Sequence, residues 1–197
     1  MKIIIKSVLI AAVLSVIISM LPFSAQCDHL TKEVFRLHIL ADNDTREAQS
    51  LKLKVRDAVL KKTEKLYKSA DNLSEAIRLT DENLSTIADT AKKTLAKNGC
   101  SYPVKAEIKR MYFNTRYYGR VTMPSGFYDA LRITIGEGKG HNWWCVMYPS
   151  LCVGASADYN ELKDRTSDDE YRVMTEDGYE FKFKVIEYFK SFCSLFS

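Results

Sequence analysis

The segment from Gly136 to Cys145 concentrates the residue types that could do chemistry, and it reads Gly-Glu-Gly-Lys-Gly-His-Asn-Trp-Trp-Cys. His141 and Cys145 lie four residues apart and are the only neighbouring candidates for a base and a thiol nucleophile. One hypothesis is therefore a Cys/His hydrolase that acts outside the cytoplasm, for example on the cell wall. A disulfide at Cys145 would exclude it, because a bonded sulfur is not a thiolate nucleophile. The chain has no Gly-x-Ser-x-Gly and no His-Glu-x-x-His motif.

The three alternating glycines of this segment do not fit the interior of an ordinary strand. They indicate a backbone that needs permissive angles or that another chain approaches closely. Their Gly-x-Gly-x-Gly spacing differs from the dinucleotide fingerprint, and no helical pattern follows it. Cys-x-x-Cys and Cys/His metal-ligand spacings are missing as well. The sequence therefore predicts neither a cofactor nor a metal site.

The two tryptophans of the chain are adjacent in the same segment, and two interpretations remain open for them. They could close one end of the core, with their indole N–H groups bonded locally. They could instead form a recognition surface, since tryptophan is enriched at binding hot spots. In the second interpretation, nearby polar groups would fix the partner's orientation. The predicted partner-binding residues are then Gly138, Gly140, His141, Asn142, Trp143 and Trp144, with Arg116 from the preceding strand region.

The N-terminus has the layout of a secretory signal peptide. Lys2 and Lys6 precede an uncharged apolar run from Ser7 to Leu21, and Pro22 and small residues follow it. The run is close to the shortest length that spans a bilayer, roughly 17–25 residues, so an uncleaved anchor through residues 3–21 is the alternative. We therefore expect residues 1–27 to be a signal peptide or membrane anchor. We expect residues 28–197 to form a single domain that is exported across the cytoplasmic membrane.

Export changes the interpretation of the five cysteines, because paired cysteines outside the cytoplasm tend to form disulfides. Cys145 and Cys152 are close in sequence, and Pro149 between them helps the chain to turn. They are the predicted disulfide pair, with two buried free thiols as the alternative. The roles of Cys27, Cys100 and Cys193 stay open.

The composition is that of an ordinary globular protein. Of 197 residues, 46% are hydrophobic and 27% are charged, and the formal net charge is +4. The basic residues are scattered rather than clustered, which argues against a nucleic-acid partner.

The first half of the chain alternates between strand and helix patterns. Val34 to Ala41 has apolar residues on one face and Arg36 and His38 on the other, which predicts a strand with one buried side. Asp44 to Glu47 is a capping-box pattern that begins a helix to about Tyr67, whose lysine-rich face we interpret as solvated. A second helix is expected from Asn72 to Leu95, ended by Asn-Gly.

From Cys100 the periodicity becomes two, which predicts strands near residues 102–109, 111–123 and 127–135 joined as an antiparallel meander. The tail predicts a short helix to about Met174, a strand over Tyr179–Val185 and a short amphipathic helix over 186–196. The fold class is therefore α+β: an N-terminal signal or anchor helix, then one domain with two long helices packed on a mainly antiparallel sheet.

Several of these segments resemble the stage II sporulation protein R family. The run Tyr128–Val146 is similar to the family signature, as are Phe113–Arg116 with the following Tyr118-Gly119, and Pro149–Cys152. Upstream, the matching positions are Leu37–Asp44, Gln49, Leu51-Lys52 and Val55–Val59. The resemblance covers about residues 33 to 153, with Asp42-Asn43 and Ser150 as small departures from the usual pattern.

The resemblance implies an exported signalling protein of endospore-forming bacteria. Such proteins are secreted from the forespore into the intermembrane space, where they activate a membrane-embedded aspartic protease of the mother cell. That protease removes the pro-sequence of the early mother-cell sigma factor. A signalling ligand needs no active site of its own, so no enzymatic activity is expected. The extracytoplasmic hydrolase and a passive envelope-binding module remain as alternatives.

Overall fold

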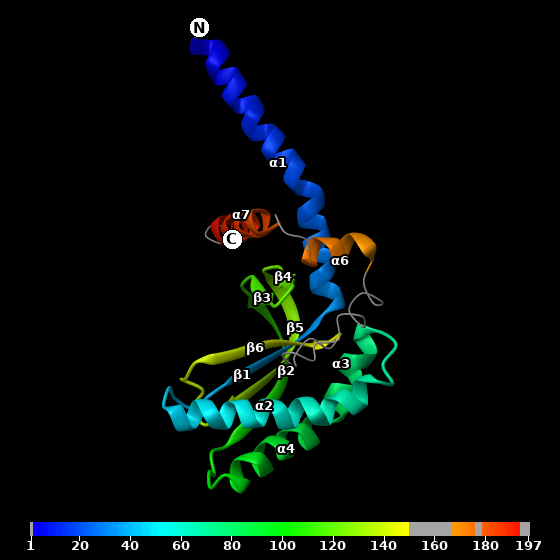
Figure 1. The fold of residues 1–197 in the computed structure, drawn as a ribbon, viewed down its shortest axis with the longest axis vertical. Helices are drawn as coiled ribbons and strands as arrows, with labels where there is room; N and C mark the ends of the chain where they lie inside the picture. The colour runs from blue at the N-terminus through cyan, green and yellow to red at the C-terminus, as the bar shows by residue number, and fades with distance from the viewer. Residues whose placement is uncertain (1, 150–166, 176–178, 194–197) are drawn as a thin grey trace. The chain divides into compact units, whose positions relative to one another are not determined.

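The computed structural model describes residues 2–149, 167–175 and 179–193, which form two compact units (Figure 1). The larger unit comprises Lys32–Tyr112 and Phe127–Thr166, and the smaller one Met1–Thr31, Phe113–Gly126 and Ser167–Ser197. The described elements are α1 (Lys2–Glu33), β1 (Phe35–Leu40), α2 (Arg46–Tyr67), α3 (Leu73–Glu82), α4 (Leu84–Lys97), β2 (Val104–Phe113), β3 (Arg116–Tyr118), β4 (Val121–Met123), β5 (Gly126–Ile135), β6 (Asn142–Tyr148), α6 (Asp168–Thr175) and α7 (Glu180–Cys193). The chain is α+β, as predicted.

The larger unit is built on a four-stranded, mainly antiparallel sheet with the order β2-β5-β1-β6. β1 is antiparallel to β6 but parallel to β5, so Leu37 lies between Leu131 and Cys145. The predicted antiparallel meander of three consecutive strands is wrong, because the intervening β3 and β4 form a separate two-stranded sheet and β2 neighbours β5 directly. The sheet order also places β1 between the later strands β5 and β6. All six residues of β1 are buried, which is typical of a strand in the centre of a sheet.

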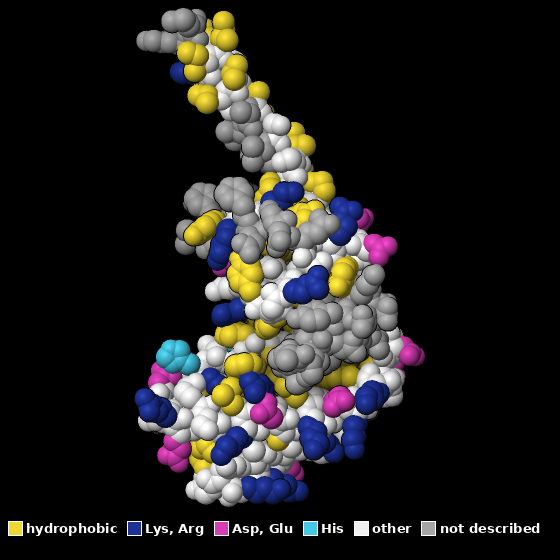
Figure 2. Space-filling model, viewed as in Figure 1, with side chains coloured by type: hydrophobic (Ala, Val, Ile, Leu, Met, Phe, Trp, Pro, Cys, Tyr) yellow, Lys and Arg dark blue, Asp and Glu magenta, His cyan; other side chains and the backbone are white. Residues whose placement is uncertain are grey.

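One face of this sheet is covered by α2, α3 and α4, and α2 and α4 run side by side along it (Figure 1). The core lies between them and contains Leu37, Ile39, Leu131, Val55, Ile87 and Leu95. Basic and acidic side chains are interspersed over the outer surface of these helices (Figure 2). The lysines of the outer face of α2 are exposed, as predicted: Lys54, Lys61, Lys62 and Lys65.

The predicted second long helix is two helices, α3 and α4, with a break at Asn83. Asn72 is the N-cap of α3, since its side chain accepts a 3.0 Å hydrogen bond from the backbone N–H of Glu75. Gly99 has a φ of +74° directly after α4, which confirms the predicted stop. The apolar stripe is continuous through Asn83, so its periodicity gave no indication of the break.

Two strand predictions are wrong. Residues 111–123 are not one strand but the end of β2 and the β3–β4 hairpin, in which Arg116 pairs with Met123. The predicted strand Tyr179–Val185 lies mainly in α7, where Phe183 and Ile186 are buried three residues apart, a helical spacing. A seven-residue alternation of apolar and charged residues, as in Tyr179–Val185, is too short to distinguish the two periods.

In the smaller unit, the end of the predicted leader is part of a packed cluster. Phe23 of α1 is 4% exposed, and its ring centroid lies 5.0 Å from that of Phe183 and 5.4 Å from that of Tyr179. A role of residues 1–27 as signal peptide or anchor stays a prediction. Within the described ranges, no helix combines the length and the apolar character that crossing a membrane requires.

Candidate interaction site

The glycine-rich loop between β5 and β6 is bonded to the segment that follows β1. The backbone N–H of Gly140 donates to the carbonyl of Ala41 (3.0 Å), and that of Lys139 donates to the carbonyl of Asp42 (3.1 Å). The carboxylate of Asp42 accepts from the backbone N–H of Glu137 at 2.7 Å. These bonds hold the loop against a chain segment almost 100 residues earlier in the sequence.

The glycines are needed for this close approach within the chain. A Cβ at Gly140 would lie 2.2 Å from the carbonyl oxygen of Asn43, and one at Gly136 would lie 2.0 Å from Asp42 Oδ1. Gly136 and Gly138 also have positive φ angles, +59° and +65°. Internal packing therefore explains the three glycines, and a contact of this loop with a partner stays a prediction.

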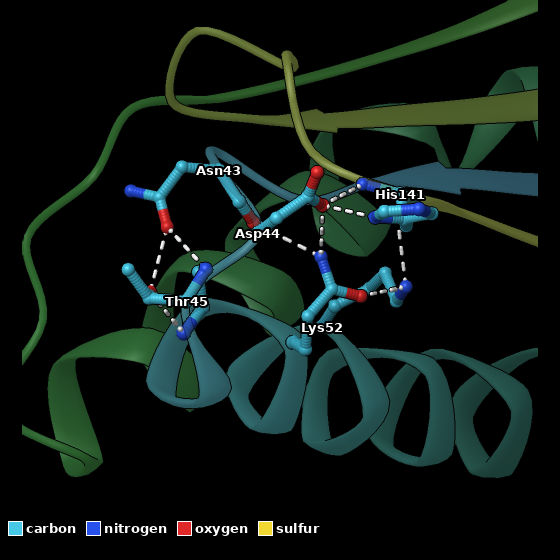
Figure 3. A network of polar contacts seen from close by, with 7 residues as sticks. Asn43, Asp44, Thr45, Lys52 and His141 are labelled. Carbon is cyan, nitrogen blue, oxygen red and sulfur yellow. Dashed lines mark hydrogen bonds and ion pairs between the residues drawn. The ribbon is translucent and has the colours of Figure 1, made fainter.

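Asp44 and His141 are joined at the exposed end of the same loop (Figure 3). Asp44 Oδ1 accepts from the backbone N–H of His141 at 2.5 Å and also contacts the ring Nδ1 of His141. The bond from the backbone N–H of His141 is the largest cause of a lowered pKa at the Asp44 carboxyl. The predicted capping role of Asp44 is wrong: the N-cap of α2 is Thr45, whose hydroxyl accepts from the backbone N–H of Ala48 at 3.2 Å.

Lys52 supports the loop from α2 (Figure 3). Its ammonium group donates to the carbonyl of His141 at 2.9 Å and to Gln49 Oε1 at 2.5 Å, and the residue is 4% exposed. Burial is the main cause of a lowered pKa at Lys52. The sequence analysis missed this residue because lysines of a helix usually face water. A usable indication was its position four residues after Ala48, on the apolar stripe.

The two tryptophans lie in β6 rather than in the loop, and they point to opposite faces of the sheet. Trp143 packs against the core, and the guanidinium carbon of Arg56 lies 4.3 Å from its ring centroid. Trp144 stacks on His38 with a centroid distance of 3.9 Å and an interplanar angle of 3°. Both indoles are half-buried, so local packing accounts for part of each ring.

The polar face of β1 is buried, contrary to the prediction of a strand with one buried side. His38 is 3% exposed and its Nε2 lies 3.0 Å from Asn142 Oδ1. Burial lowers the pKa of His38 to about 4, so the ring is neutral near pH 7. Arg36 is fully buried and donates from Nε to the carbonyl of Cys145 at 3.1 Å. The alternating pattern of β1 predicted a solvated polar face, so it gave no indication that these polar groups are buried.

The remaining predicted residues lie apart from this network. Cys145 is 1% exposed in the core, whereas His141 is exposed at the surface, so the two do not form a nucleophile–base pair. Cys152 lies outside the described residues, and the predicted Cys145–Cys152 disulfide stays a prediction. Arg116 belongs to β3 in the smaller unit.

The fold and the site define an α+β protein that holds an exposed loop in place by a polar network from two distant chain segments. The family model described as Stage II sporulation protein R (spore_II_R) matches residues 31–158, and the chain belongs to this family. A curated relative, Stage II sporulation protein R of Bacillus subtilis (strain 168), is 34% identical over 144 residues. That match covers 73% of this chain and 64% of the relative.

The chain thus spans less than two thirds of the length of the relative that it matches. No solved structure matches the chain. The family membership that the sequence motifs predicted is confirmed, and with it a role connected with sporulation. The family's description names a sporulation protein rather than an enzymatic activity.

Proposed function

We propose that this chain is an exported sporulation signalling protein that activates a membrane-embedded aspartic protease. In this proposal a leader within residues 1–27 directs export from the forespore into the intermembrane space. The activated protease then processes the pro-form of the early mother-cell sigma factor. Membership of the stage II sporulation protein R family supports this role.

The observation that carries the proposal is the combination of exposure and fixation at His141. Its side chain is 79% exposed, yet its backbone N–H, ring and carbonyl are held by Asp44 and Lys52. A loop held in one conformation loses little conformational entropy on binding, so it is suited to recognition. We therefore assign the partner contact to His141 and the exposed Asn142.

The neighbouring residues complete the proposed contact. Trp143 and Trp144 follow Asn142 on opposite faces of β6, and each keeps part of its indole accessible. Gly140 lets the loop lie close against Asn43, and Gly138 lets it lie close against Thr134. Their contribution is to shape the loop, whereas the side chains at 141–144 would touch the partner.

A reconstitution tests the proposal. The full chain, the protease and the pro-sigma factor are produced together in a non-sporulating host, and processing is followed by immunoblotting. His141→Ala should be exported and keep its melting temperature but lose processing. Asn142→Ala should also lose processing, with a somewhat lower melting temperature because the buried His38 loses its hydrogen-bond partner. His29→Ala is the matched control, because His29 is also an exposed histidine but lies in α1 of the smaller unit.

The outcomes of this experiment distinguish a wrong function from a wrong assignment of the contact residues. If the unaltered chain does not trigger processing, the proposed function is wrong. If it does, and both variants are folded, exported and fully active, the contact lies elsewhere. The β3 segment with Arg116 would then be the next region to test.

A further inference from the structure

The sheet face opposite α2, α3 and α4 carries a second polar cluster, next to the loop. The strand register places His38 directly between Arg132 of β5 and Trp144 of β6, and directly paired residues point to the same face. Arg132 Nη1 lies 3.9 Å from Glu107 Oε1 of β2. We name this cluster the Arg132 patch, and its members are His38, Glu107, Arg132, Asn142 and Trp144.

The positive charge of Arg132 is poorly neutralised. Its one ion pair among the described residues is the long contact with Glu107, whose other oxygen lies only 2.6 Å from Lys105 Nζ. Arg132 Nε is buried and has no hydrogen-bond partner in the described part of the chain. The side chain is 29% exposed, so its guanidinium group is partly accessible from solvent. An arginine in this state gains from a further carboxylate.

The groups that face Arg132 do not supply that carboxylate. His38 is neutral near pH 7, and its Nδ1 also has no partner among the described residues. Lys105 and Lys109 lie on the same face of β2 as Glu107, and both are exposed. On this face, β2 and β5 together therefore carry one carboxylate, that of Glu107, and three cationic side chains: Lys105, Lys109 and Arg132.

We propose that the Arg132 patch binds an acidic segment of the protein partner, with a carboxylate of that segment paired to Arg132. The proposal rests on the proposed function and extends its contact surface. Charge complementarity favours this occupant, and Asn142 joins the patch to the His141 loop, since its side chain is bonded to His38. Arginine and tryptophan are also the residues that most often carry binding energy at interfaces.

The test titrates the purified full chain onto spheroplasts that contain the protease and the pro-sigma factor, and it measures the concentration for half-maximal processing. Arg132→Gln should raise that concentration about tenfold, and Arg132→Glu should raise it further. Added salt should raise the half-maximal concentration of the unaltered chain by a larger factor than that of Arg132→Gln. The reason is that the variant lacks one charge pair that salt can screen.

Arg110→Gln is the matched control. Arg110 lies on β2 on the opposite face, where it pairs with Asp129 at 3.6 Å, and its removal changes the net charge equally. Melting temperatures of all variants check that the fold is retained. A separate sedimentation with phosphatidylglycerol vesicles tests a lipid surface as the occupant.

Loss of potency in the Arg132 variants alone supports the proposal. If the Arg132 and Arg110 variants activate equally well while the unaltered chain is active, the proposal is overturned and the proposed function stands. If the unaltered chain triggers no processing, both are overturned. Vesicle binding that depends on Arg132 would assign the patch to a lipid surface and also overturn the proposal.

Discussion

The carboxylate of Asp44 accepts a hydrogen bond from the backbone N–H of His141, 97 residues further along the chain. The same oxygen contacts the imidazole Nδ1 of His141 and accepts from Gln49 Nε2 at 3.2 Å. One side chain thereby joins the end of β1, the first turns of α2 and the start of β6.

The Asp44–His141 contact should make the stability of the loop sensitive to acid. The pKa of Asp44 is lowered in the folded chain, so its contribution is present above the ordinary pKa of an aspartate and is lost as the pH falls through the folded value. Asp44→Asn removes the charge and should flatten this dependence. Thermal unfolding between pH 2 and 7 measures it, and parallel curves for the two proteins would contradict the prediction.

His38 should produce a second pH dependence, at higher pH. Its folded pKa of about 4 lies below the ordinary 6.5, so the unfolded chain binds the extra proton between these values. Stability should therefore fall as the pH is lowered from 6.5 to 4, by on the order of 2 kcal/mol.

The matched variant for this prediction is His38→Gln, which keeps a polar side chain but does not titrate. Its absolute stability is expected to be lower, because the stack on Trp144 is lost. The slope of unfolding free energy against pH between 4 and 6.5 is the informative quantity. An unchanged slope in His38→Gln would show that another group titrates in this window.

Gly140→Ala should destabilise the chain by about 2 kcal/mol or more, because the added Cβ would lie 2.2 Å from a backbone oxygen that cannot easily move. Gly99→Ala is the comparison. It has open space around the Cβ but a φ of +74°, so it should cost only about 1–2 kcal/mol. Chemical denaturation ranks the two variants. A cost at Gly140 no larger than that at Gly99 would mean that the loop relaxes freely.

Four of the five cysteines should separate into three classes by reactivity. Cys100 carries a half-buried thiol outside any disulfide and should react with an alkylating agent in the folded chain, whereas the buried thiol of Cys27 should react only after unfolding. Cys145 and Cys152 are predicted to resist alkylation without a reductant, because sulfurs joined in the predicted disulfide are not thiolate nucleophiles. Closing so short a loop would stabilise the fold by roughly 2–3 kcal/mol.

Non-reducing peptide mapping of the exported protein checks this assignment. A peptide that links residues 145 and 152 is the expected product. Recovery of both residues as alkylated thiols would contradict the predicted disulfide. Early reaction of Cys27 would show that α1 does not remain packed as described.

Local patterns in the sequence predicted those features that depend on neighbouring residues alone. The helix ending at Tyr67, the cap at Asn72, the stop at Gly99 and the strand ending at Ile135 follow from hydrophobic periodicity and capping chemistry. The family motifs are likewise local strings. The same patterns failed where the alternating run was short, as over Tyr179–Val185 at the start of α7, or where a turn interrupted an even alternation, as at β3.

The α+β class, most of the helices and strands, the glycine-rich loop and the family could therefore be predicted from the sequence alone. The insertion of β1 between β5 and β6 could not be predicted in this way, because it depends on long-range contacts. It buries Arg36 and His38 and brings Asp44 to His141. Long-range contacts also bury Lys52, which the sequence analysis interpreted as solvated, and its ammonium group there supports the loop. The physical reason is that a local period specifies which side of an element is apolar, whereas strand order and polar pairing depend on contacts between residues far apart in the chain.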